Sequence, residues 1–208
     1  MSTTADEWDQ VRIALDADGV SGADDFGRFV NDTTHLRAST LDERAAAPTL
    51  LRLLPSLTDG RVVVAVAGHL RRPWARPTAF VPLLAAFRSW ASRDWSVGWS
   101  VGDALVNAAD ESRVDELLTI ANETDLGKAR QMIVYSLWRF RKDRRVATTL
   151  DHLVTDADVT LHAASALRRT VGNEVALETL TRARDGESDP TVQRVLDTEI
   201  KKARRASE

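Results

Sequence analysis

The sequence predicts an all-α protein, an α-α superhelix (solenoid) of about five helical hairpins that follow an N-terminal helical cap. Two observations lead to this fold class. An acidic or turn residue followed by apolar residues three, seven and eleven positions later occurs five times, at steps of 35, 32, 30 and 33 residues. Each interval also contains a second apolar segment with helical spacing. The repeating unit is therefore a pair of helices.

The five copies of the pattern begin at Asp59, Asp94, Leu126, Asp156 and Asp189. Spacings of three and four residues keep apolar side chains on one stripe of a helix, whereas a strand would need strict alternation. We expect the aspartates to cap the helix N-termini, with Asp125 taking that role in the third copy. Pro190 fits the first helical position after Asp189, where its missing N–H has no consequence.

The intervening helices are expected at residues 43–57, 78–91, 112–122, 143–154 and 174–184. A hairpin this short cannot bury its apolar stripe alone, so neighbouring hairpins must stack to complete the core. We expect residues 42–208 to form one continuous solenoid domain. Residues 1–41 should form the cap, with one helix through Trp8 and Leu15 and a second through Phe26, Phe29 and Val30.

The short hairpin with "D-x-x-V…A…L" in its second helix resembles the short form of the HEAT repeat, as in bacterial HEAT-like proteins, over roughly residues 42–205. This resemblance implies a fold more than a function, because such repeats serve scaffolds, adaptors, lyase subunits and nucleic-acid enzymes. We expect a non-catalytic scaffold or adaptor that binds a protein or peptide on its concave face. A bilin-lyase-type subunit is an alternative that depends on the repeat form alone.

Composition narrows the classes of partner and compartment. The net charge of −3 gives no attraction of the whole protein to nucleic acid or to an anionic membrane. The absence of cysteine excludes disulfides, thiolate metal sites and a cysteine nucleophile. The polar start "MSTTADEWDQ" and the short apolar run "VVVAVAG" predict neither a signal peptide nor a membrane span. We expect a cytoplasmic protein with no membrane partner.

The sequence predicts no metal ion, no cofactor and no catalytic residue. The stretch "DADGVSGADD" at 16–25 superficially resembles a calcium loop, but Gly19 stands at its fourth position and Gly27 where a bidentate glutamate is required. An interhelix turn with aspartate caps is the alternative. No histidine has the spacing of a metal ligand, and no nucleophile elbow, Walker loop or dinucleotide-binding glycine pattern occurs.

Cations recur at equivalent positions of the second helices, twelve and thirteen residues after each start. The pairs are Arg71 and Arg72, Val106 and Asn107, Trp138 and Arg139, Arg168 and Arg169, and Lys201 and Lys202. Equivalent positions line up in a solenoid, so four of the five units place cations on one ridge. These cations either complement the helix dipoles and cap carbonyl groups, or form a basic surface for a partner. Both interpretations stay open.

The predicted partner-binding residues are Trp99, Asp103, Tyr135, Arg139, Arg168 and Arg169. Trp99 and Asp103, one helical turn apart, are expected beside Tyr135 and Arg139 in a patch midway along the solenoid. Large aromatic residues beside arginine are typical anchors of protein interfaces. We therefore expect an acidic protein or peptide partner with apolar side chains, with nucleic acid as the alternative partner.

A sharper alternative depends on "WSVGD". Trp99 and Asp103, with Arg130 in the next repeat, are similar to the arrangement in HEAT-like alkylpurine DNA glycosylases. The resemblance implies that Trp99 forms the lesion cleft, Asp103 stabilises the cationic sugar and Arg130 contacts a phosphate. The chain departs from that family at "ASALRR", where a further cleft aromatic is expected. This enzyme is the alternative to the scaffold.

Overall fold

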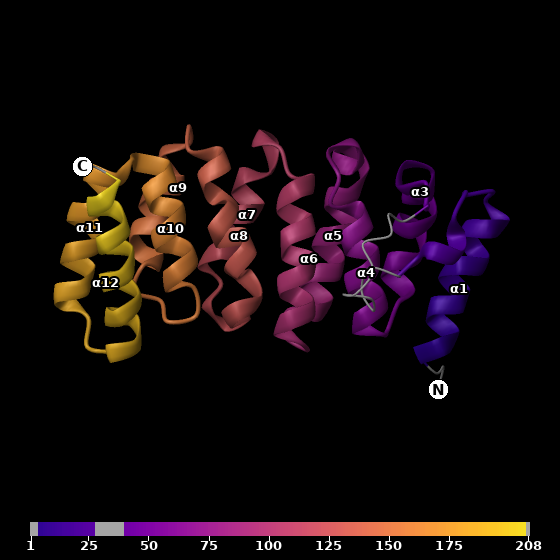
Figure 1. The fold of residues 1–208 in the computed structure, drawn as a ribbon, viewed down its shortest axis with the longest axis horizontal. Coiled ribbons are helices and arrows are strands. Elements are labelled where there is room, and N and C mark those ends of the chain that lie inside the picture. The colour runs from indigo at the N-terminus through magenta and orange to yellow at the C-terminus, as the bar shows by residue number, and fades with distance from the viewer. Residues whose placement is uncertain (1–3, 28–39, 207–208) are drawn as a thin grey trace. The chain divides into compact units, whose positions relative to one another are not determined.

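The computed structural model describes residues 4–27 and 40–206 (Figure 1). Helices form all the regular secondary structure of this part of the chain, so the predicted all-α class is confirmed. The chain divides into two compact units, Met1–Ala109 and Asp110–Glu208. The predicted continuity of residues 42–208 as one solenoid stays a prediction, as does the role of residues 1–41 as a cap.

The first unit contains five α-helices and three short 3-10 helices in its described residues. In chain order they are α1 (Thr4–Ala17), η1 (Ala23–Asp25), α3 (Glu43–Leu53), η2 (Leu54–Ser56), α4 (Gly60–Leu70), η3 (Pro73–Ala75), α5 (Arg76–Trp90) and α6 (Trp95–Ala108). Helix α5 packs on α6, and α4 also packs on α6. The second helices of the two hairpins, α4 and α6, therefore lie side by side.

The second unit contains six α-helices and three 3-10 helices in its described residues. They are η4 (Glu111–Arg113), α7 (Val114–Asn122), η5 (Thr124–Arg130), α8 (Gln131–Ser136), η6 (Leu137–Phe140), α9 (Arg144–Leu153), α10 (Thr160–Val171), α11 (Asn173–Gly186) and α12 (Pro190–Arg205). Helix α10 contacts both α8 and α12, and α7 contacts α9. Within this unit, too, corresponding helices of successive hairpins are neighbours.

Aspartate caps begin three of the predicted second helices. The carboxylate of Asp59 accepts from the amide of Arg61 at 2.8 Å, and Asp189 accepts from Thr191 at 2.7 Å. Asp94 accepts from the amides of Ser96 and Val97 at the start of α6. These predicted caps are confirmed, because each carboxylate satisfies first-turn N–H groups that have no partner inside the helix.

The third and fourth copies depart from the predicted pattern. Asp125 is exposed and lies inside η5, where Gly127 adopts φ 49° and interrupts the helix. Helix α8 therefore begins only at Gln131 and has six residues. In the fourth copy, α10 begins at Thr160, and Asp156 instead accepts from the amide of Asp158 and from Arg130. The predicted cap at Asp125 is wrong, because this residue lies inside η5. Asp156 caps the turn that leads into α10, whose own N-cap is Val159, so the predicted start of this helix is three residues early.

The first helix of the predicted cap region is confirmed as α1, which buries Trp8, Val11 and Leu15. The centroid of the buried Phe26 ring lies 5.5 Å from the centroid of the Trp8 ring. Gly27 has φ 82°, and a Cβ there would lie 2.1 Å from the Trp8 ring, so only glycine fits. Phe29 and Val30 lie outside the described residues.

The acidic stretch at residues 16–25 is used internally. Asp18 accepts from the hydroxyl of Thr49 and from Arg52, the latter at 2.7 Å. These two hydrogen bonds hold the pKa of Asp18 below its ordinary value. Asp25 accepts from the amide of Thr40 at 2.8 Å. These carboxylates therefore tie the turn to the rest of the first unit.

No helix among the described residues is long and apolar enough to cross a membrane.

Candidate partner-binding surface

Four side chains of the second unit form a cation–aromatic cluster: Tyr135, Trp138, His162 and Arg169. The guanidinium carbon of Arg169 lies 5.0 Å from the centroid of the Tyr135 ring and 5.3 Å from that of Trp138. Both distances lie within the range at which a cation is attracted to the face of an aromatic ring. The cluster joins α10, which carries Arg169 and His162, to α8 and η6, which carry the two large aromatic residues.

His162 closes one side of the cluster. Its ring meets the Tyr135 ring edge to face, with centroids 6.3 Å apart and an interplanar angle of 89°. Burial lowers the pKa of His162 below its ordinary value, because a charged imidazole is poorly solvated there. Its Nδ1 is buried and has no hydrogen-bond partner. The neutral ring therefore acts as a packing partner of Tyr135.

Arg169 is the exposed member of the cluster, whereas Tyr135 and Trp138 are half-buried. The contacts with the two rings restrict the guanidinium, and its N–H groups can still donate hydrogen bonds. No hydrogen bond or ion pair to another described residue uses the Arg169 side chain. An arginine held in this way can bind a carboxylate while the neighbouring rings contact apolar groups.

The other two predicted arginines, Arg168 and Arg139, make different contacts from those of Arg169. Arg168 donates to Asn173 at 3.1 Å and to Glu199 at 2.9 Å, and Glu199 is only 1% exposed. Arg139 is half-buried, with its guanidinium carbon 5.9 Å from the centroid of the Phe140 ring. Arg168 therefore holds α10 to α12, and its charge is compensated inside the unit.

Trp99 and Asp103 lie on α6 in the first unit. Trp99 is half-buried, and Asp103 is buried and paired with Arg71. The amide of Asn107 donates to the backbone carbonyl of Asp103 at 2.7 Å. The carboxylate of Asp103 therefore already has a cationic partner. Because Tyr135 belongs to the second unit, the predicted patch that joins it to Trp99 stays a prediction.

Most cations of the predicted ridge are paired with carboxylates. Arg72 donates two hydrogen bonds to the carboxylate of Glu43, at 2.7 and 3.0 Å. Lys202 donates to Glu199 at 2.6 Å. The pairs Arg71–Asp103 and Arg168–Glu199 each connect second helices of successive hairpins, α4 to α6 and α10 to α12. Arg72–Glu43 lies within one hairpin, and Lys202–Glu199 lies within α12. Among the described residues, two ridge cations therefore connect successive hairpins, a third arrangement beside the two that the sequence left open.

Arg130 is fully buried, with 0% of its side chain exposed. It donates to the carbonyl of Ala121 at 2.8 Å and to Asp156 at 2.5 Å. A phosphate contact requires a guanidinium at the surface, so the role that the glycosylase resemblance implied for Arg130 is wrong. The residue instead ties the start of α8 to the end of α7 and to the turn before α10.

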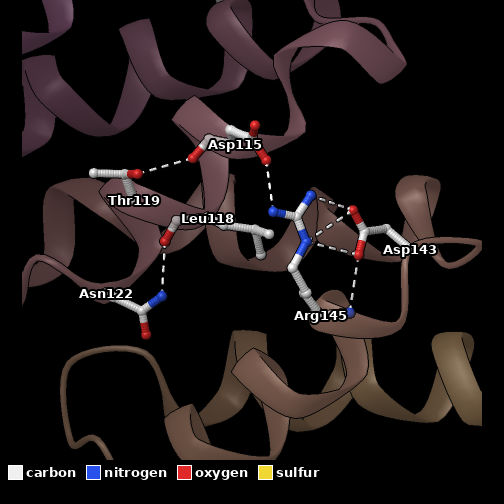
Figure 2. A network of polar contacts seen from close by, with 6 residues as sticks. All are labelled: Asp115, Leu118, Thr119, Asn122, Asp143 and Arg145. Atoms are coloured by element: carbon white, nitrogen blue, oxygen red, sulfur yellow. Dashed lines mark hydrogen bonds and ion pairs between the residues drawn. The ribbon is translucent and has the colours of Figure 1, made fainter.

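Apart from Arg139, the residues of one basic turn, "RFRKDRR" at 139–145, were not predicted as part of a site. Figure 2 shows Arg145 from this turn between two carboxylates, Asp143 and Asp115. Its Nη1 lies 2.7 Å from Asp115, and its Nη2 lies 2.6 Å from Asp143. Five cations within seven residues were the signal that could have identified this turn.

Among residues 4–27 and 40–206, no group of three or more histidine, aspartate or glutamate side chains is placed to hold a metal ion.

Comparison with known proteins identifies no relative: no family model, no curated protein and no solved structure matches this chain. The chemistry of the cluster must therefore be judged from its own residues.

Proposed function

We propose that the protein is a non-catalytic scaffold of HEAT-like hairpins that binds an acidic peptide segment with apolar side chains. One observation carries the proposal: the exposed guanidinium of Arg169 lies over the rings of Tyr135 and Trp138. A partner carboxylate would bind the edge of the guanidinium, and a neighbouring apolar side chain would contact the rings. Arginine, tyrosine and tryptophan are the residues that most often dominate binding energy at protein interfaces.

The contacts of Arg169 with the two rings favour binding because they remove part of the entropic penalty. A free arginine side chain loses about 2 kcal/mol of rotamer entropy when it is fixed. The two rings restrict Arg169 before any partner arrives, so a smaller part of this penalty falls on the binding step. A cation already paired inside the protein, such as Arg168, offers no comparable advantage, because its carboxylate partner would first have to be displaced.

The packing within each unit supports the HEAT-like part of the proposal. Second helices of successive hairpins are neighbours, α4 with α6 in the first unit and α8 with α10 and α12 in the second. Such stacking is what a chain of short hairpins needs to bury its apolar stripes. The lack of cysteine supports a reducing compartment such as the cytoplasm.

Selection of random peptides displayed on phage against the full chain tests this function. We expect the selected peptides to combine aspartate or glutamate with aromatic or aliphatic residues. Arg169→Ala should weaken a selected peptide about tenfold, which corresponds to about 1.4 kcal/mol. The matched control is Arg194→Ala, which removes an exposed arginine of α12. Peptides without acidic residues, or equal affinity for Arg169→Ala and the wild type, would contradict the proposal.

A further inference from the structure

A cavity of about 450 Å³ lies in the second unit, between the start of α7 and the basic turn that precedes α9. Three cations line it: Arg139, Arg141 and Lys142. Phe140 and Val114, which are both largely buried, supply apolar wall. The cavity therefore combines a concentration of positive charge with a small apolar surface.

Two carboxylates, Glu111 and Asp143, also line the cavity, but Asp143 is already paired with Arg145. Asp143 accepts from the amide of Arg145 at 2.9 Å and from its guanidinium at 2.6 Å. These bonds, led by the guanidinium, hold the pKa of Asp143 below its ordinary value. Arg145 compensates the charge of Asp143 (Figure 2), so Arg141 and Lys142 face one further lining carboxylate, the exposed Glu111.

Arg141 and Lys142 are exposed, and neither side chain makes an ion pair or hydrogen bond within residues 4–27 and 40–206. This sets them apart from Arg71, Arg72 and Arg168, whose charges are compensated by carboxylates. Like charges that are adjacent in sequence repel each other, and an anion in the cavity would relieve that repulsion. The planar fork of an arginine and the point charge of a lysine together match the oxygens of a phosphate group.

We propose that this cavity binds the phosphate group of a small organic phosphate. Its volume lies within the range of small-molecule sites, roughly 300 to 1,000 Å³. Arg141 and Lys142 would hold the phosphate oxygens, and the wall formed by Phe140 and Val114 would contact the carbon part of the ligand. Nucleic acid fits less well, because duplex binding requires cations along many phosphates, whereas these gather at one cavity and the chain carries a net charge of −3.

Isothermal titration calorimetry on the full chain tests the proposal, with adenosine monophosphate as the probe and adenosine and inorganic phosphate as comparisons. Chloride at about 0.15 M screens weak non-specific attraction. The nucleotide should bind about tenfold or more tightly than either comparison ligand. The double variant Arg141→Glu with Lys142→Glu should lose this binding. The matched control, Arg194→Glu with Lys201→Glu, reverses two exposed charges on α12 and should bind like the wild type.

Far-UV circular dichroism and urea unfolding establish that both double variants keep the wild-type fold. Adenosine binding as tightly as the nucleotide would overturn the role of the phosphate. Inorganic phosphate binding as tightly would overturn the role of the apolar wall. Equal weakening in both double variants would reduce the effect to net charge and overturn the site. Tighter binding of a short single-stranded DNA would replace this proposal by a nucleic-acid surface. None of these results bears on the peptide site at Arg169, which uses other residues.

Discussion

Arg130 and Asp156 form an ion pair in which the arginine is fully buried and the aspartate is partly exposed. The Nη2 of Arg130 lies 2.5 Å from the Asp156 carboxylate, and its Nη1 donates to the carbonyl of Ala121 at 2.8 Å. Its Nε has no partner. One side chain therefore joins three segments of the second unit: the end of α7, the start of α8 and the turn before α10.

Arg130→Met should destabilise the second unit strongly. The substitution leaves a carbonyl and a partly buried carboxylate without their donor, and breaking such a pair costs about 3 kcal/mol. Urea unfolding followed by circular dichroism measures the change in the free energy of unfolding. The matched control is Arg182→Met, because Arg182 is 68% exposed and pairs with Asp151 at 3.1 Å. That variant should lose less than about 1 kcal/mol. Similar losses in both would contradict the structural role of Arg130.

Asp59→Ala and Asp125→Ala should differ in their effect on stability, although the sequence assigned both residues the same role. Asp59 caps α4, so its loss should cost about 1 kcal/mol. Asp125 is exposed and caps no helix, so its replacement should change stability by less than about 0.5 kcal/mol. Thermal unfolding of the two variants provides the measurement. A larger loss for Asp125→Ala would mean that the helix of the third copy begins earlier than Gln131.

The pattern of apolar residues was sufficient to predict the helices and most of their boundaries. Spacings of three and four residues report directly on which side of a helix is buried, and Asp59, Asp94 and Asp189 were in the right place to cap. The prediction for the third copy was wrong because its apolar residues keep the helical spacing while the non-helical conformation of Gly127 interrupts the helix. Periodicity records burial, and a glycine turn between two buried residues leaves it unchanged.

The candidate site was predictable only in part. Tyr135 and Arg169 were chosen from residue type and repeat position, and the structure brings them together in one cluster. Arg168 is adjacent in sequence and has the same chemistry, yet it points to Glu199. Neighbouring residues on a helix face different directions, about 100° apart, so repeat position alone cannot separate a cation that binds a partner from one that holds two helices together.

His162→Gln should make the stability of the protein less sensitive to pH. Burial holds the pKa of His162 in the folded chain below its value in the unfolded chain, which is about 6.5. Its contribution to stability is therefore complete above that value and is lost as the pH falls toward the lower pKa of the folded state. His69 has a pKa lowered mainly by burial and acts in the same direction, so the slope should become shallower and not vanish.

Urea midpoints measured between about pH 5 and about pH 7.5 cover the range in which this proton is taken up. His152→Gln, at an exposed position of α9, is the matched control. The effect should be specific to His162, whose ring packs against Tyr135. An equal change of slope in both variants, or an unchanged slope in His162→Gln, would show that the buried imidazole is not responsible.

Arg168→Met and Arg169→Met should separate stability from binding at two adjacent positions. Arg168 pairs with Glu199, which is almost completely buried, and among the described residues Lys202 is the cation that Glu199 keeps when the arginine is removed. We expect Arg168→Met to lower the free energy of unfolding by about 1 to 3 kcal/mol. Arg169→Met removes only an exposed cation–π contact, so it should lower stability by about 0.5 to 1 kcal/mol and instead weaken the selected peptide.

A double-mutant cycle with Glu199→Gln distinguishes the Arg168–Glu199 pair from a general effect of lost packing. If the pair itself stabilises the contact between α10 and α12, Arg168→Met should be less harmful when residue 199 is already neutral, because no buried charge is then left without its partner. The same cycle with Arg169→Met should give additive effects, since Arg169 contacts Tyr135 and Trp138 and makes no described contact with Glu199. Coupling at Arg169 instead of Arg168 would assign the structural and binding roles to the opposite arginines.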